Sequence, residues 1–199
     1  MNTVSKLATA TIACITLSAC VTTRSYVDPQ YHRAGYDQIY RLNQPVSVMV
    51  DAQFKRNGEP YPAVDAELRE VVERTLRATG DFTPTSSLGD AGVIQVVANN
   101  IADLAAARAK GFGTGLTFGA AGSMVTDAYE FKFTYRGTDG KEHQHTYQDA
   151  IYTTVGNASP PVVAEPTTPD LAFEKVIEDV TLNFVKDLQT EGALPKASN

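Results

Sequence analysis

The chain has 199 residues, a formal net charge of −6 and two cysteines. This length is enough for one domain with a proper hydrophobic core. Binding to nucleic acid needs clustered Lys and Arg side chains that neutralise phosphates, so the acidic balance argues against a nucleic-acid partner.

The first 19 residues have the three parts of a secretion signal. Lys6 and the amino terminus give a positive start, and residues 7–17 form an apolar segment without charge. A membrane-spanning helix needs about 20 apolar residues, so this segment is too short to be one. Small residues then lead to a cysteine in Leu17-Ser18-Ala19-Cys20. The pattern predicts export and cleavage close to that cysteine.

The tetrapeptide Leu17-Ser18-Ala19-Cys20 resembles the lipobox of bacterial lipoproteins. The resemblance implies that residues 1–19 are removed and that Cys20 carries a diacylglycerol thioether, usually with a third acyl chain such as palmitate. Two or more acyl chains hold a protein stably on a membrane. In enterobacteria an Asp after the cysteine often retains the protein in the inner membrane. Val21 stands there, so the resemblance implies the outer membrane, with a domain facing the periplasm.

Two alternatives to this interpretation involve the same segment. The chain could carry an ordinary secretion signal that happens to end near Cys20. Cleavage before Cys14 is the other alternative, but it would leave too short an apolar core.

After removal of residues 1–19, 16 Lys and Arg remain against 23 Asp and Glu, so the net charge is near −7. With Cys14 lost and Cys20 acylated, we expect no disulfide, and stability must come from packing.

Residues 20–44 are polar and show no sustained period of a strand or helix, which predicts a lipid-anchored tether. Asp28-Pro29 is a turn signal within it. Tyr36 and Tyr40, near its end, are expected to lie against the surface of the domain.

The domain is expected over residues 45–190, beginning with an alternating strand at 46–54 that ends at Asn57-Gly58. Pro62 suits the first turn of an amphipathic helix, and Gly80 suits its left-handed C-cap. Short strands follow at 82–85 and 93–98.

The second half of the domain is expected to be a hairpin and a helix. Alternating strands at 129–136 and 141–154 flank the turn 137–140, and three prolines keep 155–168 irregular. Thr168-Pro169-Asp170 predicts the start of an amphipathic helix, and Gly192 its end, followed by a loose tail over 191–199. This element order predicts an α+β domain of two layers, with two helices on one face of a mostly antiparallel sheet.

A glycine-rich segment precedes the hairpin, with Gly111, Gly115 and Gly119 four residues apart. Small residues at this spacing resemble the glycine-zipper regions of small outer-membrane lipoproteins, which implies a membrane or partner contact. A phosphate-binding loop is a second hypothesis, but the spacing matches no known fingerprint. The third is a flexible apolar crossover loop without a dedicated site.

His143 and His145 are the candidates for a ligand or metal site. They lie two apart on a predicted strand, so both side chains leave the same face, about 7 Å apart, and Tyr147 and Asp149 continue it. Two imidazoles and a carboxylate suit a divalent metal, but most such pairs are polar surface. No nucleophile elbow or zinc-protease motif occurs, so we expect neither catalysis nor a cofactor.

From residue 46 to residue 188 the element order resembles that of small α+β lipoproteins, including auxiliary subunits of envelope transport and assembly machines. The resemblance implies an adaptor or assembly subunit that binds an envelope protein through the glycine-rich segment or an open strand edge. The alternative is a periplasmic module that binds a ligand or metal at His143 and His145.

Overall fold

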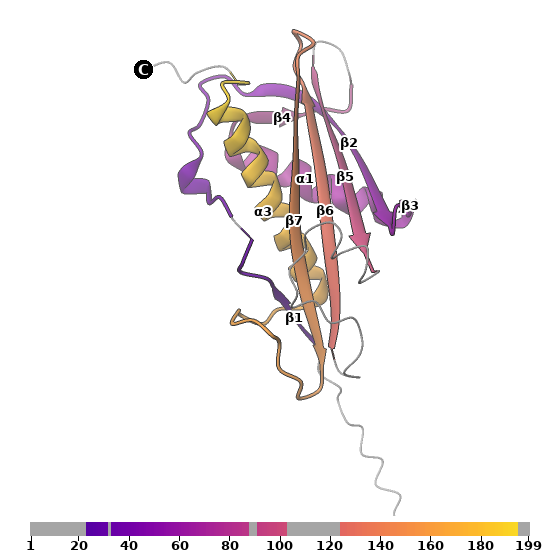
Figure 1. Ribbon diagram of the computed structural model, residues 1–199. Helices are drawn as coiled ribbons and strands as arrows, with labels where there is room; N and C mark the ends of the chain where they lie inside the picture. The colour runs from indigo at the N-terminus through magenta and orange to yellow at the C-terminus, as the bar shows by residue number, and fades with distance from the viewer. Residues whose placement is uncertain (1–22, 32, 88–90, 103–123, 195–199) are drawn as a thin grey trace, which may run out of the picture.

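The structure, a computed structural model, describes residues 23–31, 33–87, 91–102 and 124–194 and has an α+β fold (Figure 1). Seven strands form one mixed sheet in the order β1-β7-β6-β5-β2-β3, and β4 also pairs with β2. The strands are β1 (Thr23–Val27), β2 (Val46–Arg56), β3 (Glu59–Pro60), β4 (Phe82–Pro84), β5 (Gly92–Ile101), β6 (Met124–Arg136) and β7 (Glu142–Val155). The helices of this part of the chain are α1 (Asp65–Thr79) and α3 (Pro169–Thr190), with short 3-10 turns η1 (Tyr36–Gln38) and η2 (Pro62–Val64).

The sheet is mostly antiparallel, as the sequence predicts. Strand β1 pairs antiparallel with β7, β7 with β6, and β6 with β5. Strand β2 is parallel to both β5 and β4, because helix α1 carries the chain back before β4 begins. The register of β6 against β7 runs without a bulge from Met124 opposite Thr154 to Arg136 opposite Glu142.

The ends of both helices follow the sequence signals. Pro62 begins the turn η2 that leads into α1, and Gly80 closes α1 with a φ of 78°. That left-handed conformation costs a residue with a Cβ more than it costs glycine. At the start of α3 the Thr168 hydroxyl accepts a hydrogen bond from the amide of Leu171 at 3.4 Å.

Both helices cover the same face of the sheet, and the core lies between them and the strands. Helix α3 packs over β6 and β7, where the rings of Phe133 and Phe184 have centroids 4.9 Å apart. Helix α1 packs against α3 and β2. The largest fully buried side chains come from both helices and from β2, β5 and β6, among them Phe131, Phe133, Phe184, Leu68, Leu76, Ile94 and Ile177.

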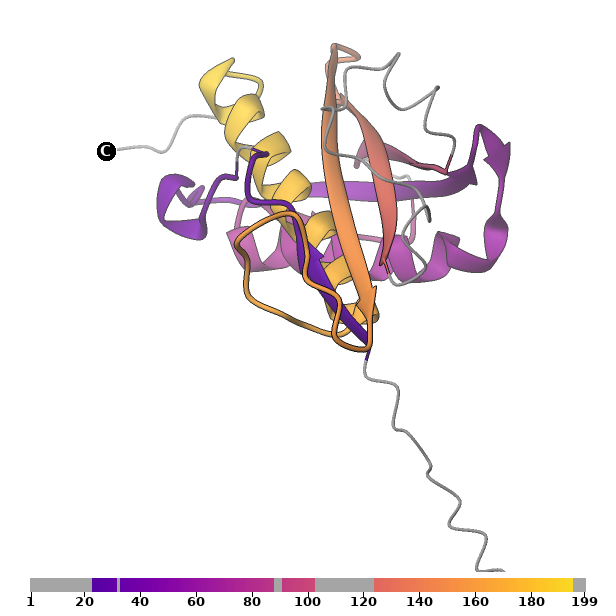
Figure 2. The same cartoon turned by 60° about the horizontal axis from the view of Figure 1, so that its bottom comes forward.

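The tether expected over residues 20–44 is wrong from Thr23 onward. Thr23–Val27 is strand β1, and the chain after it lies along α3 (Figure 2). The amide of Ala34 donates to Asn183 at 2.6 Å, and the Tyr36 hydroxyl donates to Glu178 at 2.7 Å. The segment lacks a periodic pattern because irregular hydrogen bonds to α3, rather than an apolar stripe, hold most of it in place. Tyr36 and Tyr40 lie on the surface as expected.

Candidate functional site

The open edge of β7 is the candidate site. Strand β1 pairs with β7 only from Ile151 to Val155. In the described part of the chain, no strand pairs with the same edge of β7 between Glu142 and Ala150. At about 3.3 Å per residue, the part of this stretch from Glu142 to Thr146 offers an edge roughly 15 Å long.

The alternation of the antiparallel ladder decides which backbone groups face this edge. The carbonyl of Ala150 accepts a hydrogen bond from the amide of Asp28 at 2.9 Å, so Ala150 faces away from β6. In a strand every second residue presents its N–H and C=O to the same side. The backbone groups of Thr146 and Gln144 therefore face the open edge, while those of His145 face β6. Unpaired edge groups of this kind are a template for an added strand.

A groove of about 410 Å³ runs along this edge between β7 and α3. Each lining residue carries a group that donates or accepts hydrogen bonds, although about half of the lining surface is apolar. The lining residues are Tyr31, Thr146, Tyr147, Gln148, Asn183, Lys186 and Asp187. The Tyr147 hydroxyl donates to the carboxylate of Asp187 at 2.6 Å, and the ammonium of Lys186 donates to Gln38. These bonds hold side chains in the wall of the groove.

His143 and His145 lie at the distal end of this edge, and both contact the end of α3. His143 Nδ1 is hydrogen-bonded to Glu191 Oε2 at 3.0 Å, and His145 Nε2 lies 3.0 Å from Glu191 Oε1. Partial burial acts to raise the pKa of Glu191, but the His143 hydrogen bond and the imidazole charges lower it overall. One carboxylate thus bridges the two imidazoles and ties α3 to β7.

The structure brings His143, His145, Tyr147 and Asp149 onto one face, as the strand spacing predicts. That face packs against α3, contrary to the exposed polar face that is usual for such pairs. Among the described residues, no group of three or more His, Cys, Asp or Glu is arranged to hold a metal ion. The metal alternative at His143 and His145 therefore lacks a ligand set there.

A buried charge cluster closes the other end of the edge. The guanidinium of Arg33 lies 3.3 Å from Asp149 and 3.2 Å from Asp179, and it also donates to the carbonyl of Asp28. Asp149 is 1 % exposed, and burial raises its pKa to about 7 although Arg33 acts to lower it. Burial also raises the pKa of Asp179. Arg33 thereby fastens the segment after β1 to both β7 and α3.

Sequence reasoning missed Arg33, Asp179 and Lys186 as parts of a site. Arg33 stands in a segment without periodicity, and the polar residues of α3 look like an ordinary solvent face. One signal was present in the sequence: α3 has apolar residues on more than one stripe, as at Leu182 and Val185, both of which are buried. A helix covered on two sides must bury some of its polar residues as well.

Several predicted site residues lie outside the described residues: Cys20 and the glycines Gly111, Gly115 and Gly119. The strands that flank the glycine-rich segment are described. Strand β5 ends at Ile101, which is opposite Ala128 near the start of β6. None of the helices in the described ranges has the length and apolar character needed to cross a bilayer.

No protein-family model and no curated protein matches this chain. Among solved structures, it is similar to a minor lipoprotein from Acinetobacter baumannii, with 15% identity, 76% of this chain and 97% of that chain covered, and a TM-score of 0.38. A PelC dodecamer from Paraburkholderia phytofirmans has 12% identity, coverage of 83% and 98%, and a TM-score of 0.35. The rare lipoprotein B from Shewanella oneidensis has 9% identity, coverage of 73% and 93%, and a TM-score of 0.33.

Proposed function

We propose that the chain is a lipid-anchored lipoprotein of the bacterial cell envelope and a non-catalytic adaptor on the outer membrane. The sequence Leu17-Ser18-Ala19-Cys20 supports the anchor. The adaptor role rests on the open edge of β7, which binds an extended segment of an envelope protein as an added strand. Main-chain hydrogen bonds supply the affinity in this mode of binding, and neighbouring side-chain pockets supply the specificity.

The groove beside β7 indicates the chemistry of the bound segment. A strand added to this edge lies next to Lys186, Asp187, Asn183 and Thr146, which line the groove. These side chains favour a segment with polar and charged residues on the side that faces α3. The edge from Glu142 to Thr146 accommodates a segment of about five residues at strand spacing.

One substitution tests strand addition without removing a side chain that holds the fold. Thr146→Pro deletes an N–H that faces the open edge and leaves the bonds to β6 in place, a position that tolerates proline. Thr146→Ala is the matched control, because it shortens the same side chain and keeps the N–H. The melting temperatures of both variants report whether the domain remains folded.

Partner binding is measured in two steps. A photoreactive amino acid at Gln144 is crosslinked in living cells, and mass spectrometry maps the crosslinked peptide. The affinity of that peptide for the purified protein is then compared between variants. We expect Thr146→Pro to weaken binding about tenfold or more, which corresponds to about 1.4 kcal/mol for a lost edge bond, while Thr146→Ala binds almost normally. Equal binding by a folded Thr146→Pro variant would exclude strand addition at this edge.

A further inference from the structure

The start of β1 fixes how the domain sits relative to a lipid on Cys20. Only two residues separate Cys20 from Thr23, the first residue of β1. A chain spans at most about 3.6 Å per residue, so the Cα atoms of Cys20 and Thr23 are no more than roughly 11 Å apart. A lipid on Cys20 therefore brings this end of the sheet to within that distance of the bilayer surface.

The link between Cys20 and the sheet could become longer only if residues of β1 left the sheet and lost their hydrogen bonds. It pairs with β7 along its whole length, and Ser25 exchanges two backbone hydrogen bonds with Thr167, at 2.8 and 2.9 Å. The carboxylate of Asp28 accepts a hydrogen bond from the Tyr152 hydroxyl at 2.9 Å, and the ion pairs of Arg33 follow directly. Thr23, three residues after the proposed attachment point, is thus fixed in the sheet.

We propose that the end of the sheet where β1 begins lies against the bilayer surface, with its exposed valines in the headgroup region. The inference rests on the proposed lipid at Cys20. It adds a second, direct contact between the folded domain and lipid, and it fixes the orientation of the groove.

Exposed apolar side chains gather at this end. Val155 stands opposite Thr23 in the ladder and is 38% exposed, and Val125 is 49% exposed near the start of β6. Both have the same strand parity as Phe131 and Ile151, which face the helices, so they continue that apolar face to the ends of the strands. Leu171, in the first turn of α3, is 55% exposed.

The loop after β7, which runs beside β1 in Figure 1, carries the most exposed valine. Val162 and Ala164 pack against a small cluster that includes Tyr26 and Tyr152. Val163, between them, is 98% exposed. Packing of its neighbours thus holds a large apolar side chain in solvent, a placement that lipid contact would explain.

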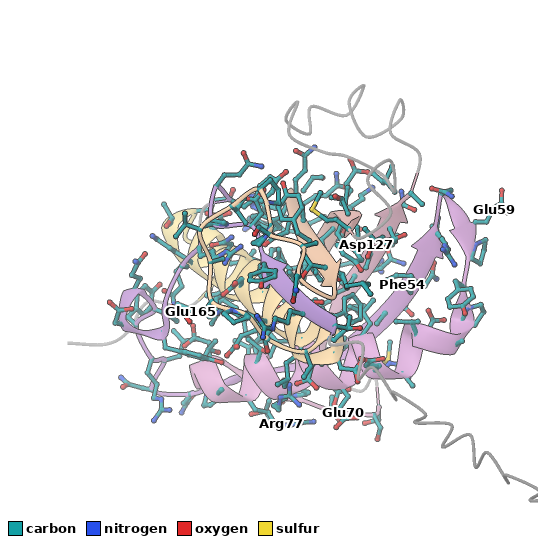
Figure 3. The ribbon with its side chains drawn as sticks, turned by 90° about the horizontal axis from the view of Figure 1, so that it is seen from below. Phe54, Glu59, Glu70, Arg77, Asp127 and Glu165 are labelled. Carbon is teal, nitrogen blue, oxygen red and sulfur yellow. The ribbon has the colours of Figure 1, made fainter. Side chains whose placement is uncertain are left out.

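Charge is unevenly distributed at this end of the sheet. Residues 153–164 contain no charged side chain, and Arg24 on β1 is exposed. Figure 3 looks onto this end and shows Asp127 and Glu165 on opposite sides of β1. The Asp127 carboxylate accepts a hydrogen bond from Asn100 at 3.0 Å. The uncharged stretch therefore lies beside an exposed cation, Arg24, near the attachment point. Acidic side chains stand at the start of α3, where Asp170 lies close enough to Glu67 to raise its pKa after the effect of burial.

The same placement directs the hairpin turn 137–140 away from the membrane (Figure 1). Strand β7 has 14 residues, so the turn lies roughly 45 Å from Val155 at strand spacing. The groove beside β7 lies between these two levels, lined by residues 146–148 of the strand. It is thus reachable by a periplasmic segment without passing the lipid surface.

The test measures the distance of three sites from lipid in the acylated full-length mature protein. Its cysteine is blocked by lipid, so single cysteines at Val155, Val163 and Thr138 each accept one environment-sensitive fluorophore. The proteins are reconstituted in phosphatidylethanolamine and phosphatidylglycerol vesicles that contain a lipid with a nitroxide quencher near the glycerol. Flotation of the vesicles reports whether each protein is membrane-bound.

We expect labels at Val155→Cys and Val163→Cys to lose roughly half of their emission, since groups at the headgroup boundary lie within reach of the quencher. The Thr138→Cys label, in the distal turn, should lose almost none. If the protein is bound to vesicles but all three labels are quenched equally weakly, the proposed contact between this end of the sheet and the bilayer is wrong. The lipid anchor on Cys20 would still stand. Protein that does not float with the vesicles would overturn the anchor, and with it the inference. Val163 is so exposed that its substitution does not perturb folding.

Discussion

The burial of Asp149 predicts how much its carboxyl group changes the free energy of unfolding with pH. Its carboxylate is buried between β7 and α3 and shares the single guanidinium of Arg33 with Asp179. Two buried carboxylates compete for that positive charge, and Lys175 assists only at 3.7 Å from Asp179. Replacing Asp149 with Asn keeps the shape of the side chain and removes its ionisation.

Whether Asp149 stabilises the fold more at low or at high pH follows from the direction of its pKa change. Burial raises the pKa of Asp149 from 3.8 to about 7 in the folded protein. The stability that the protonated group contributes is therefore complete below about pH 4 and is lost as the pH rises through about 7. One pKa unit corresponds to about 1.4 kcal/mol, so the loss amounts to at most about 4 kcal/mol.

Urea unfolding at a series of pH values, followed by circular dichroism, measures this contribution. We expect the free energy of unfolding of Asp149→Asn, relative to the unmodified protein, to increase by up to about 4 kcal/mol from pH 4 to pH 7. The exposed Asp37→Asn variant is the control and should show no such trend. A difference between Asp149→Asn and the unmodified protein that does not change with pH would show that Arg33 keeps the carboxylate ionised throughout, and the reasoning would be refuted.

Three further predictions concern the anchor, the core and the histidine pair. Cys20→Ser should move the protein from the membrane to the soluble fraction or block its processing; a matured Cys20→Ser protein that still fractionates with membranes would contradict the anchor. Phe133→Ala should lower the free energy of unfolding by about 3–5 kcal/mol in urea, because Phe133 is fully buried against Phe184; a loss below about 1 kcal/mol would contradict this packing. Glu191→Ala should cost less than about 1 kcal/mol at neutral pH, since the contacts of Glu191 with His143 and His145 are partly exposed. The pKa of Glu191 is lowered, so this contribution should disappear as the pH falls through that pKa; a cost that persists in acid would contradict the assignment.

The sequence determined the secondary structure and the fold class to a large extent. The alternation in β2, β6 and β7, the Asp139-Gly140 turn and the caps at Gly80 and Thr168 are local signals. They act over a few residues, so they can be recognised without tertiary information. The same holds for the two apolar helical stripes that place both helices on one face.

The open edge of β7 and the charge cluster beside it depend on the tertiary structure. Strand β1 is only five residues long, so its pairing with β7 defines it rather than a sequence pattern of its own. Arg33, Asp149 and Asp179 are far apart in sequence and meet only because β7 and α3 pack side by side. The open edge of β7 likewise exists because β1 ends before it reaches Asp149, and the length of a neighbouring strand is a property of the whole sheet.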